Sequence, residues 1–340
     1  MPIKSPDRIH LAQLPTPLVR LLRLERELDA SQIWMKRDDL TGLELSGNKI
    51  RKLEYVAADA IASGCDTLIT EGTPQSNHCR ATAAVCAKLG LKAHLLFRPA
   101  PTGPPCGNHL LDKLFGARIS SYTRKQFRRR EEIYREVVVE TEREGGRARV
   151  TPMGASEPLG CWGYIRAMAE LAEQLRHAGV DECDVVVAIS SGGTYAGALL
   201  GKLLHRLDHV RLWAVPVSDD IPHHTREVGR LCRAAIEEFA LPMGFDEAEL
   251  RFIDGHVGAG YAVPHEAANG ALRLLARVEG IVLDPVYTAK AFWAMLDEIR
   301  AGRLAAERPV VFIHTGGVFS NFAWPETVLA DLPASDRNTL

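Results

Sequence analysis

The sequence contains no Cys-x-x-Cys pair, no apolar run of membrane-spanning length and no internal repeat. Its seven cysteines are an odd number without such pairs, which argues against a disulfide framework and against a zinc site. The segment from Met1 to Pro17 lacks the apolar core of a signal peptide. We therefore expect a cytoplasmic protein with no bound metal and no role at a membrane. The cysteines stand at positions 65, 79, 86, 106, 161, 183 and 232.

Neither sign of charge dominates the composition. The chain has 41 Lys and Arg against 43 Asp and Glu, a net charge of -2, which gives no long-range attraction to nucleic acid or anionic membrane. The basic run 128–130 is followed directly by Glu131 and Glu132, so its charges can pair across helical turns. The expected partner is a small molecule. With 340 residues, 46% of them hydrophobic, the chain can form two domains.

Strands and helices are predicted to alternate along the chain. Short apolar runs predict strands at 33–36, 67–70, 93–97, 118–122, 149–152, 184–189, 211–215 and 310–314. Apolar residues at three- and four-residue spacing predict helices at 21–28, 49–61, 79–89, 109–115, 125–144, 160–179, 197–205, 225–239, 269–278 and 290–299. This alternation indicates an α/β fold with parallel sheets.

A turn of small residues follows the most apolar of these strands. The run 184–189 is continuously apolar, as expected of a strand buried on both faces, and it leads directly into the turn 190–197. A small-residue turn before a helix presents backbone N–H groups to an anion, most often a phosphate. The turn fits neither G-x-G-x-x-G nor a P-loop, so we expect a cofactor phosphate; a tight connection without a ligand is the alternative.

Lys49 stands at the start of a predicted helix. The positive end of that helix and the nearby Arg51 and Lys52 disfavour the protonated amine, so the nucleophilic form is easier to reach. Such a lysine can form a Schiff base with a carbonyl compound. Taken alone, the same stretch also fits a solvated lysine at a helix end.

Two further groups of polar residues are placed to face a ligand. The segment Gln75-Ser76-Asn77-His78 precedes a helix, so its backbone and side-chain donors can bind a carboxylate, although a plain N-cap would need only one of them. Tyr261, Tyr287 and the segment 314–316 lie near predicted strand ends, where ligands bind in parallel α/β sheets. Singly, each tyrosine also fits a packing role.

Together these motifs resemble the D-cysteine desulfhydrase and 1-aminocyclopropane-1-carboxylate (ACC) deaminase family. These enzymes carry pyridoxal phosphate (PLP) in fold type II and are related to the tryptophan synthase β subunit. The resemblance runs from Leu14 to Trp324. Its motifs, in chain order, are Lys36-Arg37-Asp38-Asp39 with Gly47-Asn48-Lys49, then 75–78, Ser191-Gly192-Gly193-Thr194, Asp284-Pro285-Val286-Tyr287-Thr288 and His314-Thr315-Gly316-Gly317.

The resemblance implies a role for most of these residues. Lys49 would bind the cofactor covalently, the turn Ser191, Gly192, Gly193, Thr194 and Tyr195 would hold its phosphate, Asn77 would bind its 3-hydroxyl, Tyr287 would stack on its ring and Thr315 would face its pyridine nitrogen. Ser76, Asn77, His78, Gly154 and Thr288 would bind substrate, and Ser76, Tyr261 and Tyr287 would join Lys49 in catalysis. A homodimer is also implied.

The resemblance further implies the fold and the reaction. The fold would be α/β and tryptophan synthase β-like, with two open, twisted, mostly parallel sheets flanked by helices. A large PLP-binding domain would span 1–47 and 161–340, and a small domain 48–160. The reaction would be β-elimination from a small amino acid such as D-cysteine, giving pyruvate, ammonia and sulfide, with Ser76 or Lys49 removing the α proton.

Several alternatives stay open at this point. Thr288 stands where the deaminases have glutamate, which favours elimination over opening of the ACC ring. L-cysteate with sulfite release, a tailoring lyase of specialised metabolism and a non-catalytic PLP- or amino-acid-binding protein are the others. The chain departs from the family at Ser46, at Gly154-Ala155-Ser156-Glu157 and at Tyr195, where glycine, Gly-Gly-Ser-Asn and histidine are usual. If Glu157 lines the pocket, its charge would change the accepted side chain.

Overall fold

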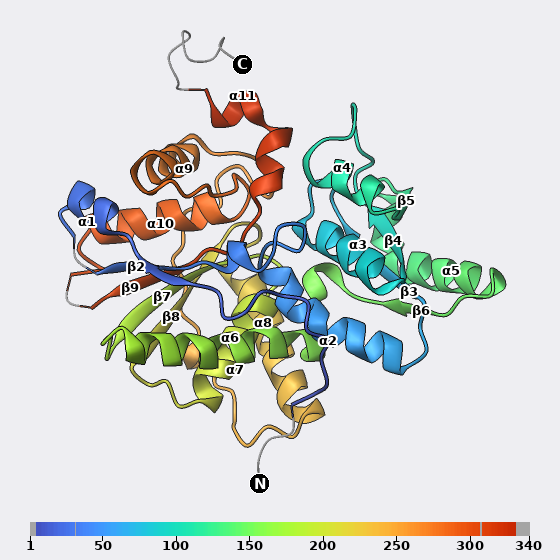
Figure 1. The fold of residues 1–340 in the computed structure, drawn as a ribbon, viewed down its shortest axis with the longest axis horizontal. Helices are drawn as coiled ribbons and strands as arrows, with labels where there is room; N and C mark the ends of the chain where they lie inside the picture. Colours follow the sequence, from blue (N-terminus) through green and yellow to red (C-terminus); the bar gives the residue numbers. More distant parts are fainter. Residues whose placement is uncertain (1–4, 31, 307, 331–340) are drawn as a thin grey trace.

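The chain folds around two separate sheets (Figure 1). The computed structural model describes residues 5–30, 32–306 and 308–330, so residues 1–4 and 331–340 of the predicted large domain lie outside the described part. Residues 18–36 and 183–313 supply the strands of one sheet, and residues 67–150 supply those of the other. The two predicted sheets are confirmed, whereas the division into domains at 1–47 with 161–340 and at 48–160 stays a prediction.

The larger sheet has five strands in the order β1-β2-β9-β7-β8. Its strands are β1 (Leu18–Arg20), β2 (Ile33–Lys36), β9 (Val310–Ile313), β7 (Cys183–Ile189) and β8 (Val210–Pro216). Among the strand pairs of this sheet in the described part of the chain, only β1–β2 is antiparallel. Every residue of β7 is buried, as its continuous apolar sequence predicts.

Helices cover both faces of this sheet (Figure 1). Along β7, Val185 and Val187 pack with one group of helices, and Val186 and Ala188 pack with the other, because successive side chains point to opposite faces. The first group is α6 (Pro158–His177), α7 (Gly193–Leu204) and α8 (Ile221–Glu238). The second is α1 (Leu22–Leu28), α9 (Glu266–Glu279) and α10 (Thr288–Arg300).

The smaller sheet has four parallel strands in the order β5-β4-β3-β6. They are β3 (Thr67–Gly72), β4 (Lys92–Phe97), β5 (Arg118–Ser121) and β6 (Ala148–Val150). On one face Leu68 packs with α2 (Asn48–Ala62) and α3 (Asn77–Leu89), next to α4 (Gly107–Leu114). On the other face Ile69 packs against α5 (Arg130–Arg143).

Short helical segments complete the fold. They are the 3₁₀ turns η1 (Asp38–Leu40), η2 (Gln126–Arg129), η3 (Met153–Ala155), η4 (Glu247–Glu249) and η5 (Val318–Ala323), and α11 (Pro325–Val328).

The predicted strands are confirmed to within two residues at each end, whereas four helices differ from the prediction by more than that. Helix α7 begins at Gly193 rather than 197, inside the predicted turn, and α9 begins at Glu266 rather than 269, where the His265 side chain caps it. The single helix predicted at 125–144 is divided into η2 and α5, because Arg129 leaves helical geometry (φ -101°, ψ 34°). Helix α8 begins at Ile221 rather than Thr225, because the Asp220 side chain caps it and Pro222 fits a first helical turn.

Candidate active site

A cavity of about 500 Å³ lies between the two sheets, at the N-terminal ends of α2, α3 and α7. Its wall comes from segments far apart in the sequence, because the carboxyl ends of the parallel strands of both sheets open toward it. Most of the predicted site residues line it: Lys49, Ser76, Asn77, His78, Gly154, Ser191, Gly192, Thr194, Tyr195, Tyr261, Tyr287 and Thr315.

Lys49 is positioned by a close contact before its helix. Gly47 has φ 104°, and a Cβ there would lie 2.7 Å from the carbonyl oxygen of Thr315, so only glycine fits. The backbone N–H of Asn48 donates to the same carbonyl at 3.1 Å, and Asn48 Nδ2 donates to Thr194 Oγ1 at 2.9 Å. These contacts tie the first turn of α2 to both β9 and α7.

The Lys49 amine is suited to act as a nucleophile. Among the described residues, no hydrogen-bond acceptor contacts it. Burial lowers the pKa of Lys49 to about 8, against the opposing effect of Asp284. At pH 7 roughly a tenth of the molecules then carry the neutral amine, far more than for a lysine with the ordinary pKa. Desolvation, rather than the neighbouring cations named in the sequence analysis, is the main cause.

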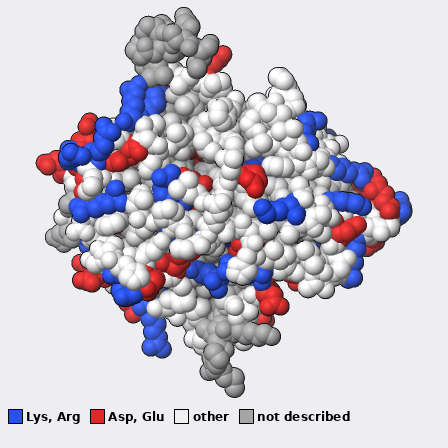
Figure 2. Space-filling view, viewed as in Figure 1, with Lys and Arg blue, Asp and Glu red and all other residues white. Residues whose placement is uncertain are grey.

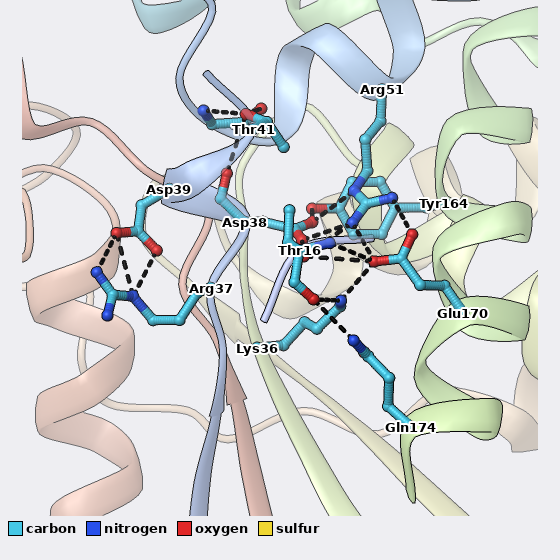
Figure 3. Close-up of polar contacts among 11 residues, drawn as sticks. Thr16, Lys36, Arg37, Asp38, Asp39, Thr41, Arg51, Tyr164, Glu170 and Gln174 are labelled. Atoms are coloured by element: carbon cyan, nitrogen blue, oxygen red, sulfur yellow. Dashed lines mark hydrogen bonds and ion pairs between the residues drawn. The ribbon is translucent and has the colours of Figure 1, made fainter. Parts of the chain in front are cut away.

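Arg51 points away from the cavity into a buried ion cluster (Figure 3). Its guanidinium donates to Asp38 and Glu170, and Tyr164 donates its hydroxyl to Asp38 at 2.6 Å. Burial raises the pKa of Asp38, but Arg51 more than offsets this, so the pKa lies below its ordinary value. The cluster joins α2, α6 and the end of β2, and so holds the helix that carries Lys49.

The turn from Ser190 to Thr194 has a shape that could hold an anion. Gly192 has φ 85°, and a Cβ on Gly193 would lie 2.8 Å from both Lys52 Nζ and Ser156 Cα. The first N–H groups of α7 have no partner within the helix. That of Gly193 donates to Ser156 Oγ at 3.2 Å, whereas those of Thr194 and Tyr195 have no acceptor among the described residues and can serve a ligand. The Lys52 amine lies beside them; burial lowers its pKa well below the ordinary value, and its Nζ donates to the Gly154 carbonyl at 3.0 Å.

Ser76, Asn77 and His78 begin α3. Ser76 Oγ accepts a hydrogen bond from the N–H of Cys79 at 3.2 Å, so it is the N-cap of the helix as well as part of the cavity wall. The carbonyl oxygen of the Asn77 side chain accepts from Asn108 Nδ2 at 2.8 Å. The His78 ring contacts Thr70 Oγ1 at 2.9 Å, and burial lowers the pKa of His78, which keeps it neutral.

Tyr261 and Tyr287 meet on the opposite wall. Their hydroxyl oxygens lie 2.5 Å apart and their rings are edge-to-face, with centroids 5.8 Å apart. Burial raises the pKa of both phenols, so both are protonated near neutral pH. The buried Asp284 accepts from the backbone N–H groups of Val286 and Tyr287, both at 3.0 Å, and so fixes the turn that carries Tyr287.

Three side chains that the sequence analysis considered for the pocket make their polar contacts outside it. Thr288 lies behind the cavity wall, where its hydroxyl donates to Asp284 Oδ1 at 2.7 Å. The Tyr195 hydroxyl accepts from the N–H of Arg251 at 3.0 Å, so only the Tyr195 backbone can serve the phosphate turn. Glu157 pairs with Arg149 at 3.1 Å and is absent from the cavity wall, so it adds no free charge there.

Other residues of the site were missed in the sequence. Lys52 was considered only for its effect on Lys49, and its place beside the phosphate turn was not predicted, although its three-residue spacing from Lys49 puts both on one helix face. Asn108 comes from α4, and Ser218 and Asp219 follow β8; nothing local marks these three as functional. Arg98 and Arg124 also line the cavity from the small-sheet side.

These residues fit pyridoxal phosphate. The Lys49 amine matches its aldehyde, the Gly192–Gly193 cradle with Lys52 matches its phosphate, and Asn77 offers a hydrogen bond to a ring substituent. Among residues 5–30, 32–306 and 308–330, no three His, Cys, Asp or Glu side chains form a metal-binding group. Fold and site together define an enzyme whose catalytic centre is built around this cofactor.

Comparison with known proteins agrees with that assignment. The family model described as "Pyridoxal-phosphate dependent enzyme" matches residues 9–316, and the chain belongs to this family. It is 40% identical over 322 residues to a D-cysteine desulfhydrase of Klebsiella pneumoniae (strain 342), covering 93% of this chain and 96% of that protein. The predicted family, fold class and cofactor are therefore confirmed.

Solved structures support the same fold. The crystal structure of an ACC deaminase homologue is 36% identical with a TM-score of 0.86 and covers 96% of each chain. A fungal L-serine ammonia-lyase from Rhizomucor miehei is 18% identical with a TM-score of 0.65, covering 92% of this chain and 95% of that chain. The second likeness concerns the fold alone.

Proposed function

We propose that the protein is a lyase that eliminates the β substituent of D-cysteine and releases pyruvate, ammonia and sulfide. The carrying observation is that Lys49, Ser76 and the Tyr261–Tyr287 pair line one cavity. The 40% identity to a D-cysteine desulfhydrase over nearly the whole chain supports this choice of substrate. When bound, pyridoxal phosphate withdraws electrons from Cα of the amino acid and makes the α proton acidic.

The cofactor would be held by three parts of this chain. Lys49 would attach it, the backbone N–H groups at 191–195 and the Lys52 ammonium would bind its phosphate, and Asn77 and Thr315 would orient its ring. Thr315 is buried and carries a hydroxyl rather than a carboxylate. A neutral partner leaves the pyridine nitrogen unprotonated, which limits carbanion lifetime and suits elimination.

The substrate carboxylate would bind at the start of α3. The N–H groups there point toward the cavity end of the helix, and the helix dipole favours an anion. Ser76 Oγ and the Lys49 amine are the two groups that can accept the α proton. Which one does so depends on the chirality of the substrate, because the two groups would face opposite sides of Cα.

The tyrosine pair would serve the departing sulfur. Both phenols are protonated near neutral pH. Because their hydroxyl groups are in close contact, one hydroxyl can donate a hydrogen bond to the leaving group while it accepts one from the other hydroxyl. The Cα–H and Cβ–S bonds break, the sulfur leaves as hydrosulfide, and water hydrolyses the remaining enamine to pyruvate and ammonia.

The test is an absorbance spectrum followed by turnover. Purified protein loaded with pyridoxal phosphate is mixed separately with D-cysteine, L-cysteine, L-cysteate and ACC, and the keto acid is assayed. We expect the cofactor band to shift with D-cysteine and pyruvate to appear with sulfide. Absence of pyruvate from D-cysteine, or α-ketobutyrate from ACC as the main product, would contradict the proposal.

A matched pair of lysine variants tests the role of Lys49. Lys49→Ala is expected to abolish turnover and covalent attachment of the cofactor. Lys202→Met is the control. Lys202 lies on α7 outside the cavity wall, and its amine pairs with Glu249 at 2.9 Å. Turnover by the Lys49 variant with the cofactor covalently bound would refute the assignment.

We also propose that the protein is a homodimer in the cytoplasm. Leu114 on α4 and Phe322 on η5 are 70% and 67% exposed, and these two elements pack together, so an apolar surface spans them.

All seven cysteines are free thiols, which fits a reducing compartment. Both signs of charge are intermixed on the face in Figure 2. No helix in the described part of the chain is long and apolar enough to cross a membrane.

Light scattering tests the dimer. Leu114→Asp is expected to lower the measured mass toward that of one chain. Val139→Asp, at a position 42% exposed on α5, is the matched control and should leave the mass unchanged. A single-chain mass for the unmodified protein would contradict the dimer.

A further inference from the structure

The segment that carries Tyr261 has little regular structure of its own. Between Ile253 and His265 the backbone forms bends and turns without a helix or strand. Gly260, immediately before Tyr261, has φ 132°, in the left-handed region that favours glycine. Such a segment contributes few internal hydrogen bonds, so the position of Tyr261 has to be set by contacts with a neighbouring element.

That element is α10, and its buried Lys290 makes the central contact. Lys290 is fully buried, and its Nζ donates to the carbonyl oxygens of Val257 at 2.7 Å and Gly260 at 2.8 Å. A buried ammonium is costly unless it is hydrogen-bonded, so a lysine retained here needs these two carbonyls. One cation thereby fixes two points of the segment, one of them adjacent to Tyr261.

Two more contacts come from the same face of α10. Trp293 lies three positions after Lys290, and its ring stacks on His265 and meets His256 edge-to-face, each at 4.4 Å between centroids. Asp297, a further turn along, contacts His256 Nε2 at 3.1 Å. Residues at these spacings share one helix face. The face therefore holds both ends of the segment, and Lys290 holds its middle.

The same helix carries the partner of Tyr261. Tyr287 is the residue immediately before α10. Helix α10 thus positions both phenols of the 2.5 Å contact. Tyr287 is covalently joined to its first residue, and Tyr261 is held through the hydrogen bond from Lys290 to Gly260. We propose that Lys290 is a positioning residue, which holds Tyr261 against Tyr287 through the Gly260 and Val257 carbonyls and so sets the geometry of the phenol pair.

The first test needs no catalysis. Thermolysin cleavage between residues 255 and 264 is followed by mass spectrometry in the unmodified protein, in Lys290→Met and in the control Lys202→Met. Because cleavage follows the population of the opened segment, we expect it to be about ten-fold faster in Lys290→Met and unchanged in the control. An unchanged rate in Lys290→Met would overturn the proposal.

The second test measures coupling to Tyr261 and rests on the proposed function. We expect Tyr261→Phe to lower kcat for D-cysteine by about 100-fold and Lys290→Met by about ten-fold or more, with KM little changed. The double variant should match Tyr261→Phe alone, because Lys290 acts through that hydroxyl. Effects that multiply would show that Lys290 does not act through Tyr261.

The two failures can be told apart. If the unmodified protein does not turn over D-cysteine, the proposed function fails, while the proteolysis result still decides whether Lys290 holds the segment. If Lys290→Met does not accumulate as folded protein, Lys290→Gln takes its place in both assays. Its amide keeps a donor for only part of the contact, so intermediate rates are expected, and rates equal to those of the unmodified protein would count against the proposal.

Discussion

The Arg51 guanidinium binds the Asp38 carboxylate through two hydrogen bonds, from Nε at 2.9 Å and from Nη2 at 2.8 Å. Both side chains are 1% exposed. Arg51 follows Lys49 by two positions on α2, so this pair fixes the start of that helix to the large sheet (Figure 3). A buried ion pair thus helps to determine where the Lys49 amine is held.

Asp38→Asn is expected to destabilise the protein strongly. Removing one partner leaves the Arg51 charge buried with incomplete compensation, which costs about 3–5 kcal/mol. Urea unfolding of the apoprotein at pH 7 measures the loss. Glu247→Gln, which breaks the exposed pair with Arg233, is the control and should change the midpoint little. Equal midpoints for the two variants would show that the buried pair does not stabilise the fold.

The pH dependence of cofactor attachment reports on Lys49. The protonated amine cannot attack an aldehyde, and the pKa of Lys49 is about 8, so the rate of covalent attachment to apoprotein should rise with pH and level off above about 8. Stopped-flow absorbance measures the rate. A rate that keeps rising toward pH 10.5, as for an exposed lysine, would contradict the lowered pKa.

Lys52→Met is expected to weaken cofactor binding while stabilising the apoprotein. The Lys52 amine lies beside the phosphate cradle, and a bound phosphate would favour its protonated form, so its loss should raise the dissociation constant about ten-fold or more. Because the pKa of Lys52 is lowered by burial, the unfolded chain binds more protons near neutral pH, and the charge opposes folding there. Cofactor titration and apoprotein unfolding measure the two effects, which should have opposite signs.

Asn108→Ala is expected to impair the site without removing any residue that lines it. Asn108 Nδ2 donates to Asn77 Oδ1 at 2.8 Å and to the Gln75 carbonyl at 2.9 Å. Removing the Asn108 amide leaves its buried hydrogen-bond partners unpaired, which should lower the free energy of unfolding by about 1–3 kcal/mol, and it frees the Asn77 amide to rotate. We expect KM for D-cysteine to rise several-fold and the unfolding midpoint to fall. A lower midpoint with unchanged KM would show that Asn108 serves stability alone.

Local sequence was sufficient for the elements that build the site. The apolar run 184–189 and the small residues after it predicted a buried strand followed by a turn into a helix, and the structure has both; anion binding by that turn stays a prediction. These features depend on periodicity and on the conformational freedom of glycine, which are properties of neighbouring residues. The division of 125–144 at Arg129 was missed, because a break inside a continuous polar helix pattern has no strong local signal.

The sequence by itself determined the fold class, the family and the chemistry of the principal groups, because the types and order of residues such as Lys49 and Ser76 carry that information. Only the tertiary structure decided which side chains reach the cavity. It turned the Thr288 hydroxyl to Asp284 and the Tyr195 hydroxyl to the Arg251 backbone, and it brought Asn108 to Asn77. Side-chain direction depends on which partners packing places within hydrogen-bond distance, and those partners lie far apart along the chain.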